Sequence, residues 1–146
     1  MKTIHTEIEI NASPEKIWDI LTDFTAFPTW NPFIKRIDGE LIAGQRLHVA
    51  IQPQGSKGMS FAPTVLEATP NKELRWIGRL FLPGIFDGEH TFRIEALDVG
   101  RVRFIHEEQF QGLLVPLFAK SLDDGTRAGF VAMNQALKAR AERPAV

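Results

Sequence analysis

The chain contains no cysteine and no tyrosine among its 146 residues. Without cysteine it can form no disulfide, no thiolate zinc site and no cysteine nucleophile. Without tyrosine, a cavity must take its polarity from other polar or charged side chains, because no phenol hydroxyl is present. The aromatic residues are instead eleven phenylalanines and three tryptophans, which are mainly apolar.

The sequence also lacks a run of like charges and a long apolar run. Lys plus Arg number 17 and Asp plus Glu number 18, and neither sign is clustered, so we expect no nucleic-acid partner. No apolar run approaches the roughly 18 residues of a membrane-spanning helix. The segment Met1–Ile10 lacks the apolar stretch of a signal peptide. We therefore expect a cytoplasmic protein without stable membrane insertion.

The length of the chain and its 44% content of hydrophobic residues suit one sizeable core and leave little room for a second domain. No internal repeat, low-complexity segment or linker-like change in composition divides the sequence. We therefore expect a single domain over residues 1–146.

The N-terminal segment predicts a strand, a helix and a turn rich in aromatic residues. Residues 4–10 alternate between apolar and polar positions, which is typical of a strand with one buried face. Ser13 as N-cap and Pro14 at the first helical position predict a helix that fades by Thr25. In the following run, Phe27-Pro28-Thr29-Trp30-Asn31-Pro32-Phe33, two prolines four residues apart are expected to prevent a regular helix. Its aromatic side chains either close one end of the core or form a pocket wall.

The middle of the chain predicts six further strands joined by short turns. They lie at about 33–41, 45–52, 59–69, 73–82, 88–97 and 101–111. With the first strand they predict a seven-stranded antiparallel meander. The loop Leu82–Gly88 is apolar where loops are usually polar, so it is a candidate pocket lid. An exposed apolar patch at Leu82 to Phe86 would instead favour a protein-interaction or co-chaperone role.

The stretch from Pro116 to about Arg140 predicts a long C-terminal helix, because apolar residues recur there at three- and four-residue steps. Its middle is slim, with Gly129 and several alanines, and Asp123-Asp124-Gly125 predicts a short break or kink. The small residues are explained equally well by that break or by a ligand lying between helix and sheet. In the second case, Gly129 and Met133 would face the ligand.

The hairpin of the last two predicted strands places titratable side chains on an inward face. A three-residue loop at Asp98-Val99-Gly100 would set Phe92 opposite His106 and His90 opposite Glu108. A carboxylate in an apolar interior needs a partner, a shifted pKa or access to water, and His90 can be that partner. The alternatives are a structural pair, a polar patch in a ligand cavity, an acid–base site, or a metal site whose spacing matches no known motif.

The opening of the chain resembles that of a known protein family. The segments that carry the resemblance are Ile8 to Trp18, Asp23-Phe24 and Phe27 to Phe33. With the order of the predicted elements, they resemble the polyketide cyclase/dehydrase and lipid-transport family of the START-like SRPBCC superfamily, over essentially the whole chain. The resemblance implies an α+β helix-grip fold. In this fold a curved seven-stranded antiparallel sheet wraps around the long C-terminal helix, short helices follow the first strand, and a hydrophobic cavity lies between sheet and helix.

The resemblance and the residue pattern together imply binding of a small hydrophobic or amphipathic molecule, such as a lipid, a polyketide-like or an aromatic compound. The candidate ligand-binding residues are Trp30, Phe33, Trp76, His90, Phe92, His106, Glu108, Phe110, Gly129 and Met133. The alternative is a cyclase, dehydratase or hydrolase that uses His90, His106 and Glu108 as acid–base groups. No metal ion or other cofactor is expected. Because no catalytic motif of a defined subgroup matches, the enzymatic question stays open, as does the oligomeric state.

Overall fold

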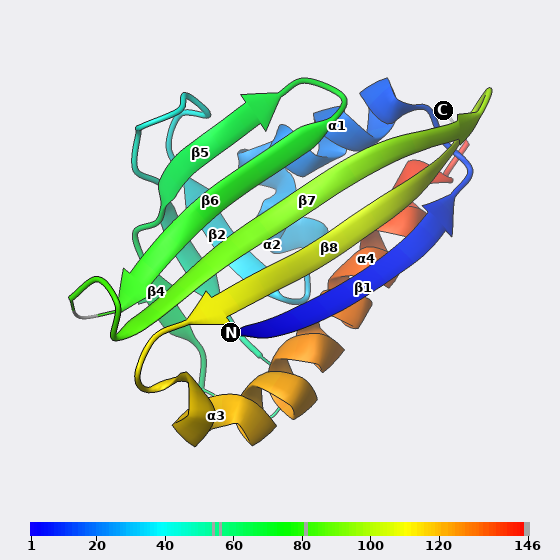
Figure 1. Ribbon diagram of the computed structural model, residues 1–146. Helices are drawn as coiled ribbons and strands as arrows, with labels where there is room; N and C mark the ends of the chain where they lie inside the picture. Colours follow the sequence, from blue (N-terminus) through cyan, green and yellow to red (C-terminus); the bar gives the residue numbers. More distant parts are fainter. Residues whose placement is uncertain (54, 56, 81, 145–146) are drawn as a thin grey trace.

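The fold consists of two antiparallel sheets and a set of helices, seen in a computed structural model that describes residues 1–53, 55, 57–80 and 82–144 (Figure 1). The larger sheet has the order β1-β8-β7-β6-β5 and the smaller has the order β2-β3-β4. The strands are β1 (Lys2–Ile10), β2 (Ile34–Asp38), β3 (His48–Ile51), β4 (Met59–Phe61), β5 (Thr64–Thr69), β6 (Glu73–Leu80), β7 (Phe86–Asp98) and β8 (Arg101–Gln111). The helices are α1 (Pro14–Thr22), α2 (Phe27–Trp30), α3 (Val115–Ser121) and α4 (Arg127–Ala141), with a 3-10 turn at Phe24–Ala26 and a π-helical turn at Leu122–Thr126.

Two sheets replace the single seven-stranded sheet that the sequence predicts. The predicted strand 59–69 is divided into β4 and β5, because Pro63 lies between them and carries no N–H for a ladder bond. The N–H of Leu47 donates to the carbonyl of Pro63 at 2.9 Å, where the chain passes from the smaller sheet to the larger. The prediction of an α+β fold with a long C-terminal helix is confirmed, whereas the predicted strand number was wrong.

Helix α1 begins where the sequence predicts. The side chain of Ser13 accepts a hydrogen bond from the N–H of Lys16 at 3.2 Å, and Pro14 occupies the first turn. The aromatic-proline run differs from its prediction, because Phe27–Trp30 forms one helical turn. Pro28 is accommodated in that turn since the first N–H groups of a helix need no partner within it.

The register of β7 and β8 is the one predicted, with His90 opposite Glu108 and Phe92 opposite His106. The turn at their end is tighter than the three-residue loop, and a register shift just before Asp98 takes up the additional residue. The pairs further along the hairpin are therefore unaffected, since a bulge changes the ladder only locally.

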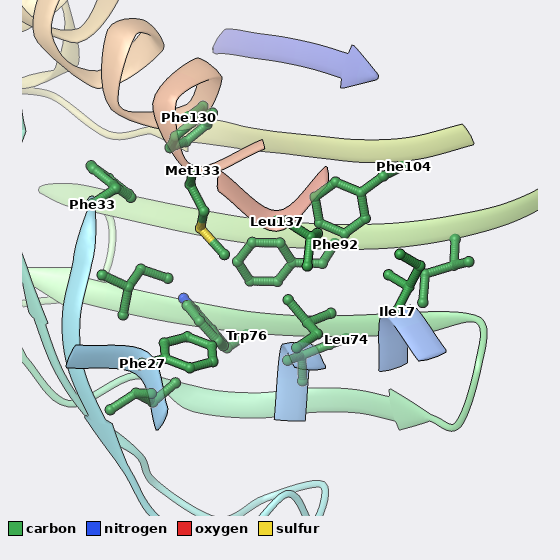
Figure 2. Packing of buried hydrophobic residues seen from close by; sticks show 14 of the residues in the cluster. Ile17, Phe27, Phe33, Leu74, Trp76, Phe92, Phe104, Phe130, Met133 and Leu137 are labelled. Atoms are coloured by element: carbon green, nitrogen blue, oxygen red, sulfur yellow. The ribbon is translucent and has the colours of Figure 1, made fainter. Parts of the chain in front are cut away.

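The hydrophobic core lies between the larger sheet and the helices α1, α2 and α4, which cover one of its faces (Figure 1). Figure 2 shows side chains from strands and helices meeting there, and those of β6, β7, β8, α1 and α4 include Leu74, Trp76, Phe92, Phe104, Ile17, Phe130, Met133 and Leu137. The C-terminal helix is interrupted by the π-helical turn, at the predicted Asp123-Asp124-Gly125. No helix in the described ranges is long and apolar enough to cross a membrane.

Candidate functional site

A cavity of about 650 Å³ opens between the two sheets and the segment from α3 to the π-helical turn. Pockets for small molecules typically measure about 300–1,000 Å³, so this one is large enough for a ligand. Most of its wall is apolar, and the large apolar side chains on it include Ile34, Ile51, Phe61, Trp76, Phe86, Phe110, Phe118 and Leu122. Apolar residues from both sheets thus face one space that they do not fill.

Half of the predicted ligand-binding residues lie on this wall. They are Phe33, Trp76, His90, Glu108 and Phe110. The other five, Trp30, Phe92, His106, Gly129 and Met133, are not among the lining residues. Trp30 packs against Phe27 with ring centroids 5.3 Å apart, while Met133 and Phe92 are buried in the core.

Gly129 lies on the buried side of α4 but faces an aromatic ring of the protein. A Cβ at this position would collide with the ring of Phe33. The space beside the slim part of the helix is therefore taken up by Phe33, which itself lines the cavity. At Gly129 the small residue therefore accommodates Phe33, whereas the sequence suggested either a helix break or direct contact with a ligand.

Two glycines of the wall were missed by the sequence reasoning. Gly78 on β6 and Gly88 on β7 are paired neighbours, and both line the cavity. A Cβ at Gly88 would collide with Oε2 of Glu108, so the missing side chain makes room for the carboxylate. A glycine inside a strand often marks such a close approach, and this signal was present in the sequence.

Glu108 and His90 form a hydrogen-bonded pair at the cavity wall. The distance from His90 Nδ1 to Glu108 Oε1 is 3.1 Å, and the two side chains are 5% and 16% exposed. Within the described part of the chain, Oε2 of Glu108 accepts no hydrogen bond. This oxygen, next to Gly88 on the wall, is left for water or a ligand.

A chain of buried hydrogen bonds continues behind His90. Its Nε2 lies 2.7 Å from Nε2 of His106, and Nδ1 of His106 lies 2.9 Å from Oδ1 of Asn134. Asn134 Nδ2 donates to the hydroxyl of Thr6 at 2.9 Å, and that hydroxyl donates to the carbonyl of His106 at 2.7 Å. The chain joins α4, β1, β8 and β7 to the cavity.

The direction of this chain follows from the single hydroxyl proton of Thr6. Because that proton goes to a carbonyl, Thr6 accepts from the Asn134 amide, whose oxygen then accepts from His106 Nδ1–H. Burial, reinforced by the neighbouring His90, holds the pKa of His106 well below its usual value of 6.5. His106 is then neutral, and its Nε2 accepts from His90 Nε2–H.

One proton remains to be placed, between His90 Nδ1 and Glu108 Oε1. A hydrogen bond there requires either an imidazolium with a carboxylate or a neutral imidazole with a carboxylic acid. In both forms the pair carries no net charge. The pair can therefore accept a hydrogen bond at Oε2, and it can exchange a proton with a molecule in the cavity.

The neutral state of His106 predicts a pH dependence of stability. Its pKa is depressed in the folded state, whereas an unfolded histidine titrates near 6.5, so the unfolded chain binds the additional proton as the pH falls. Between pH 7.5 and 5.5 we expect His106 to contribute a loss of about 1.4 kcal/mol in unfolding free energy. Urea unfolding of wild type and His106→Gln at both pH values measures this difference. Equal losses in the two proteins would contradict a neutral, buried His106.

The remaining histidines lie away from the cavity. His5 is exposed on β1, and its hydrogen bonds to Glu7 and Glu107 raise its pKa. His48 is exposed on β3. Among the residues whose placement is described, no three His, Asp or Glu side chains converge as metal ligands would.

Comparison with known proteins gives a family and a set of similar folds. The model of the family described as polyketide cyclase/dehydrase and lipid transport matches residues 1–142. No curated protein sequence matches the chain.

Several solved structures share the fold. A protein from Mesorhizobium loti has a TM-score of 0.75 at 20% identity, with 99% of this chain and 100% of that chain covered. A START superfamily protein from Mycobacterium smegmatis has a TM-score of 0.72 at 24% identity, with 96% and 97% covered. The Zhui aromatase/cyclase from a Streptomyces species has a TM-score of 0.74 at 15% identity, with 97% and 94% covered. At these identities the likeness concerns the fold alone.

Proposed function

Because the chain belongs to the polyketide cyclase/dehydrase and lipid-transport family, we propose that it binds a small hydrophobic or amphipathic molecule in the cavity described above. The observation that carries the proposal is a ligand-sized space whose wall is mostly aromatic and aliphatic. Transferring apolar ligand surface from water to such a wall is favourable by roughly 25 cal/mol per Å². Lipids, polyketide-like molecules and aromatic compounds have apolar surface of this kind.

One observation favours an enzymatic alternative, a cyclase, dehydratase or hydrolase. The pair of Glu108 and His90 holds an exchangeable proton at the wall of the cavity. In this alternative Glu108 would touch the substrate and His90 would share its proton. His106 would position His90, because it is fully buried and does not line the cavity.

Filling the cavity should weaken ligand binding. Thr126 lines the cavity from the helical side, so Thr126→Phe places a ring in the space that a ligand would occupy. The matched control is Val131→Phe, at an exposed position of α4 that does not line the cavity. We expect at least about tenfold weaker binding of N-phenyl-1-naphthylamine to Thr126→Phe, and wild-type affinity in the control.

Fluorescence titration of the naphthylamine measures both affinities, because its emission rises in an apolar site. Circular dichroism checks that the two variants are folded. The proposal would be wrong if the wild type showed no saturable binding, or if Thr126→Phe bound the probe as tightly as Val131→Phe.

A further inference from the structure

The charged side chains of the cavity wall differ in their exposure to solvent. They are Arg79, Glu108, Lys120 and Asp124. Arg79, Lys120 and Asp124 are exposed, and Nε of Arg79 lies 3.9 Å from Oδ2 of Asp87. Glu108 is the enclosed one, with a side chain only 16% exposed. The polarity that a ligand meets inside the cavity is therefore set mainly by this carboxyl group and its partner His90.

The two oxygens of Glu108 differ in what they can offer. Oε1 is engaged by His90, whereas Oε2 has no protein donor among the described residues and lies against Gly88. An enclosed carboxyl oxygen without a donor is unfavourable until solvent or a ligand supplies one. Gly88 leaves room for the carboxyl group but provides no hydrogen bond to Oε2.

The hydrogen-bond chain behind His90 keeps this arrangement fixed. Nε2 of His90 is held by His106, which is itself held by Asn134, so the ring cannot turn without breaking buried hydrogen bonds. His90 therefore meets Glu108 through Nδ1 and has no donor left for Oε2. The pair as a whole is neutral, and both ring nitrogens of His90 are engaged, so the pair has no free N–H for an anionic group.

From this geometry we infer that the cavity selects amphipathic molecules whose inner polar group donates a hydrogen bond, namely alcohols and protonated amines, with Glu108 Oε2 as the acceptor. The inference rests on the proposed binding function and adds a ligand class to it. When Glu108 is ionised and His90 is an imidazolium, an ammonium group at Oε2 still forms a charge-assisted hydrogen bond with the adjacent carboxylate oxygen, although the pair as a whole is neutral. A ligand carboxylate in the same place would have no proton to donate to Oε2, and the two oxygen acceptors would repel each other.

Three compounds with the same alkyl chain test the inference, namely decylammonium, 1-decanol and decanoate. Isothermal titration calorimetry at pH 7 gives their affinities for the wild type. We expect decylammonium and 1-decanol to bind at least about tenfold more tightly than decanoate, the size of effect that one charge-assisted hydrogen bond produces. Decanoate would bind with its head at the exposed mouth, near Lys120.

Two variants show whether Glu108 is the acceptor. Glu108→Gln keeps an amide oxygen but removes the carboxylate. The affinity for decylammonium should therefore fall by about tenfold or more, while the affinity for decanoate should change by less than about threefold. The matched control is Glu107→Gln on the same strand, because Glu107 bonds to His5 and Arg93 and does not line the cavity. It should keep the wild-type order of affinities.

The outcomes separate the inference from the function on which it rests. Equal affinities for the three compounds, or an ammonium preference that survives in Glu108→Gln, would overturn the inference and leave the binding function intact. Binding of the naphthylamine probe without binding of any decyl compound would also overturn it. If neither the probe nor the decyl compounds bind, the proposed function itself fails.

Discussion

Replacement of Phe130 by alanine is expected to lower the free energy of unfolding by about 3–5 kcal/mol. Phe130 is fully buried on α4, its ring stacks on His106 with centroids 4.0 Å apart, and it meets Phe33 edge-on at 5.4 Å. Figure 2 shows it beside Phe33 and Met133 at the junction of helix and sheet. Its removal leaves a void that rigid neighbouring rings cannot fill, which adds to the lost burial of the ring itself.

Urea unfolding of Phe130→Ala measures this effect, and the adjacent Val131→Ala is the control. Val131 is 40% exposed, so its truncation should change the free energy of unfolding by no more than about 0.5 kcal/mol. A loss below about 1 kcal/mol for Phe130→Ala would contradict the packing of α4 against the sheet.

The substitution Asn31→Ala is expected to lower the free energy of unfolding by about 2–4 kcal/mol. The side-chain oxygen of Asn31 accepts hydrogen bonds from the N–H groups of Phe33 and Ile34 at 2.9 and 2.8 Å, and all three residues are buried. Alanine would leave two buried donors without their partner, each at a cost of about 1–3 kcal/mol. Because Phe33 and Ile34 both line the cavity, the variant should also weaken binding of the naphthylamine probe.

The matched substitution is Asn11→Ala, at an exposed residue whose side chain makes no hydrogen bond within the described part of the chain. It should change the free energy of unfolding by no more than about 0.5 kcal/mol. Similar effects of the two substitutions in denaturant unfolding would show that Asn31 does not hold the turn before β2.

The pairing of His90 with Glu108 could be predicted because it depends on local information. Alternation along each strand selects the face, and the turn signal near Asp98 sets the register to within one residue. The register shift between Ala96 and Asp98 accounts for the one residue by which the turn differs from the predicted loop. The cap at Ser13 was predictable for the same reason, since the capping oxygen and its N–H partner are only three residues apart.

Features that depend on distant residues were harder to predict. Asn134 joins His106 to Thr6 across 28 and 128 residues of sequence, and periodicity carries no information about such a contact. A buried asparagine next to Met133 did offer a signal, because a polar group on an apolar helix face requires a partner. Gly129 was ambiguous for a similar reason, since only the fold brings Phe33 against it.

The division of the sheet has a signal in the sequence, namely Pro63. Pro63 falls inside the predicted strand 59–69, and a proline within a strand is usually found at an edge or a bulge. The division matters for the site, because it places β2, β3 and β4 in a second sheet. Ile34, Ile51 and Phe61 of that sheet face the larger one across the cavity.

A crystal structure of the protein grown with decylammonium would show directly where the ligand binds. We expect an alkyl chain in the cavity, in contact with Phe33, Trp76 and Phe110, with its nitrogen about 3 Å from Glu108 Oε2. The contradicting result would be a cavity filled by the wall's own side chains, with decylammonium absent or bound only on the outer surface.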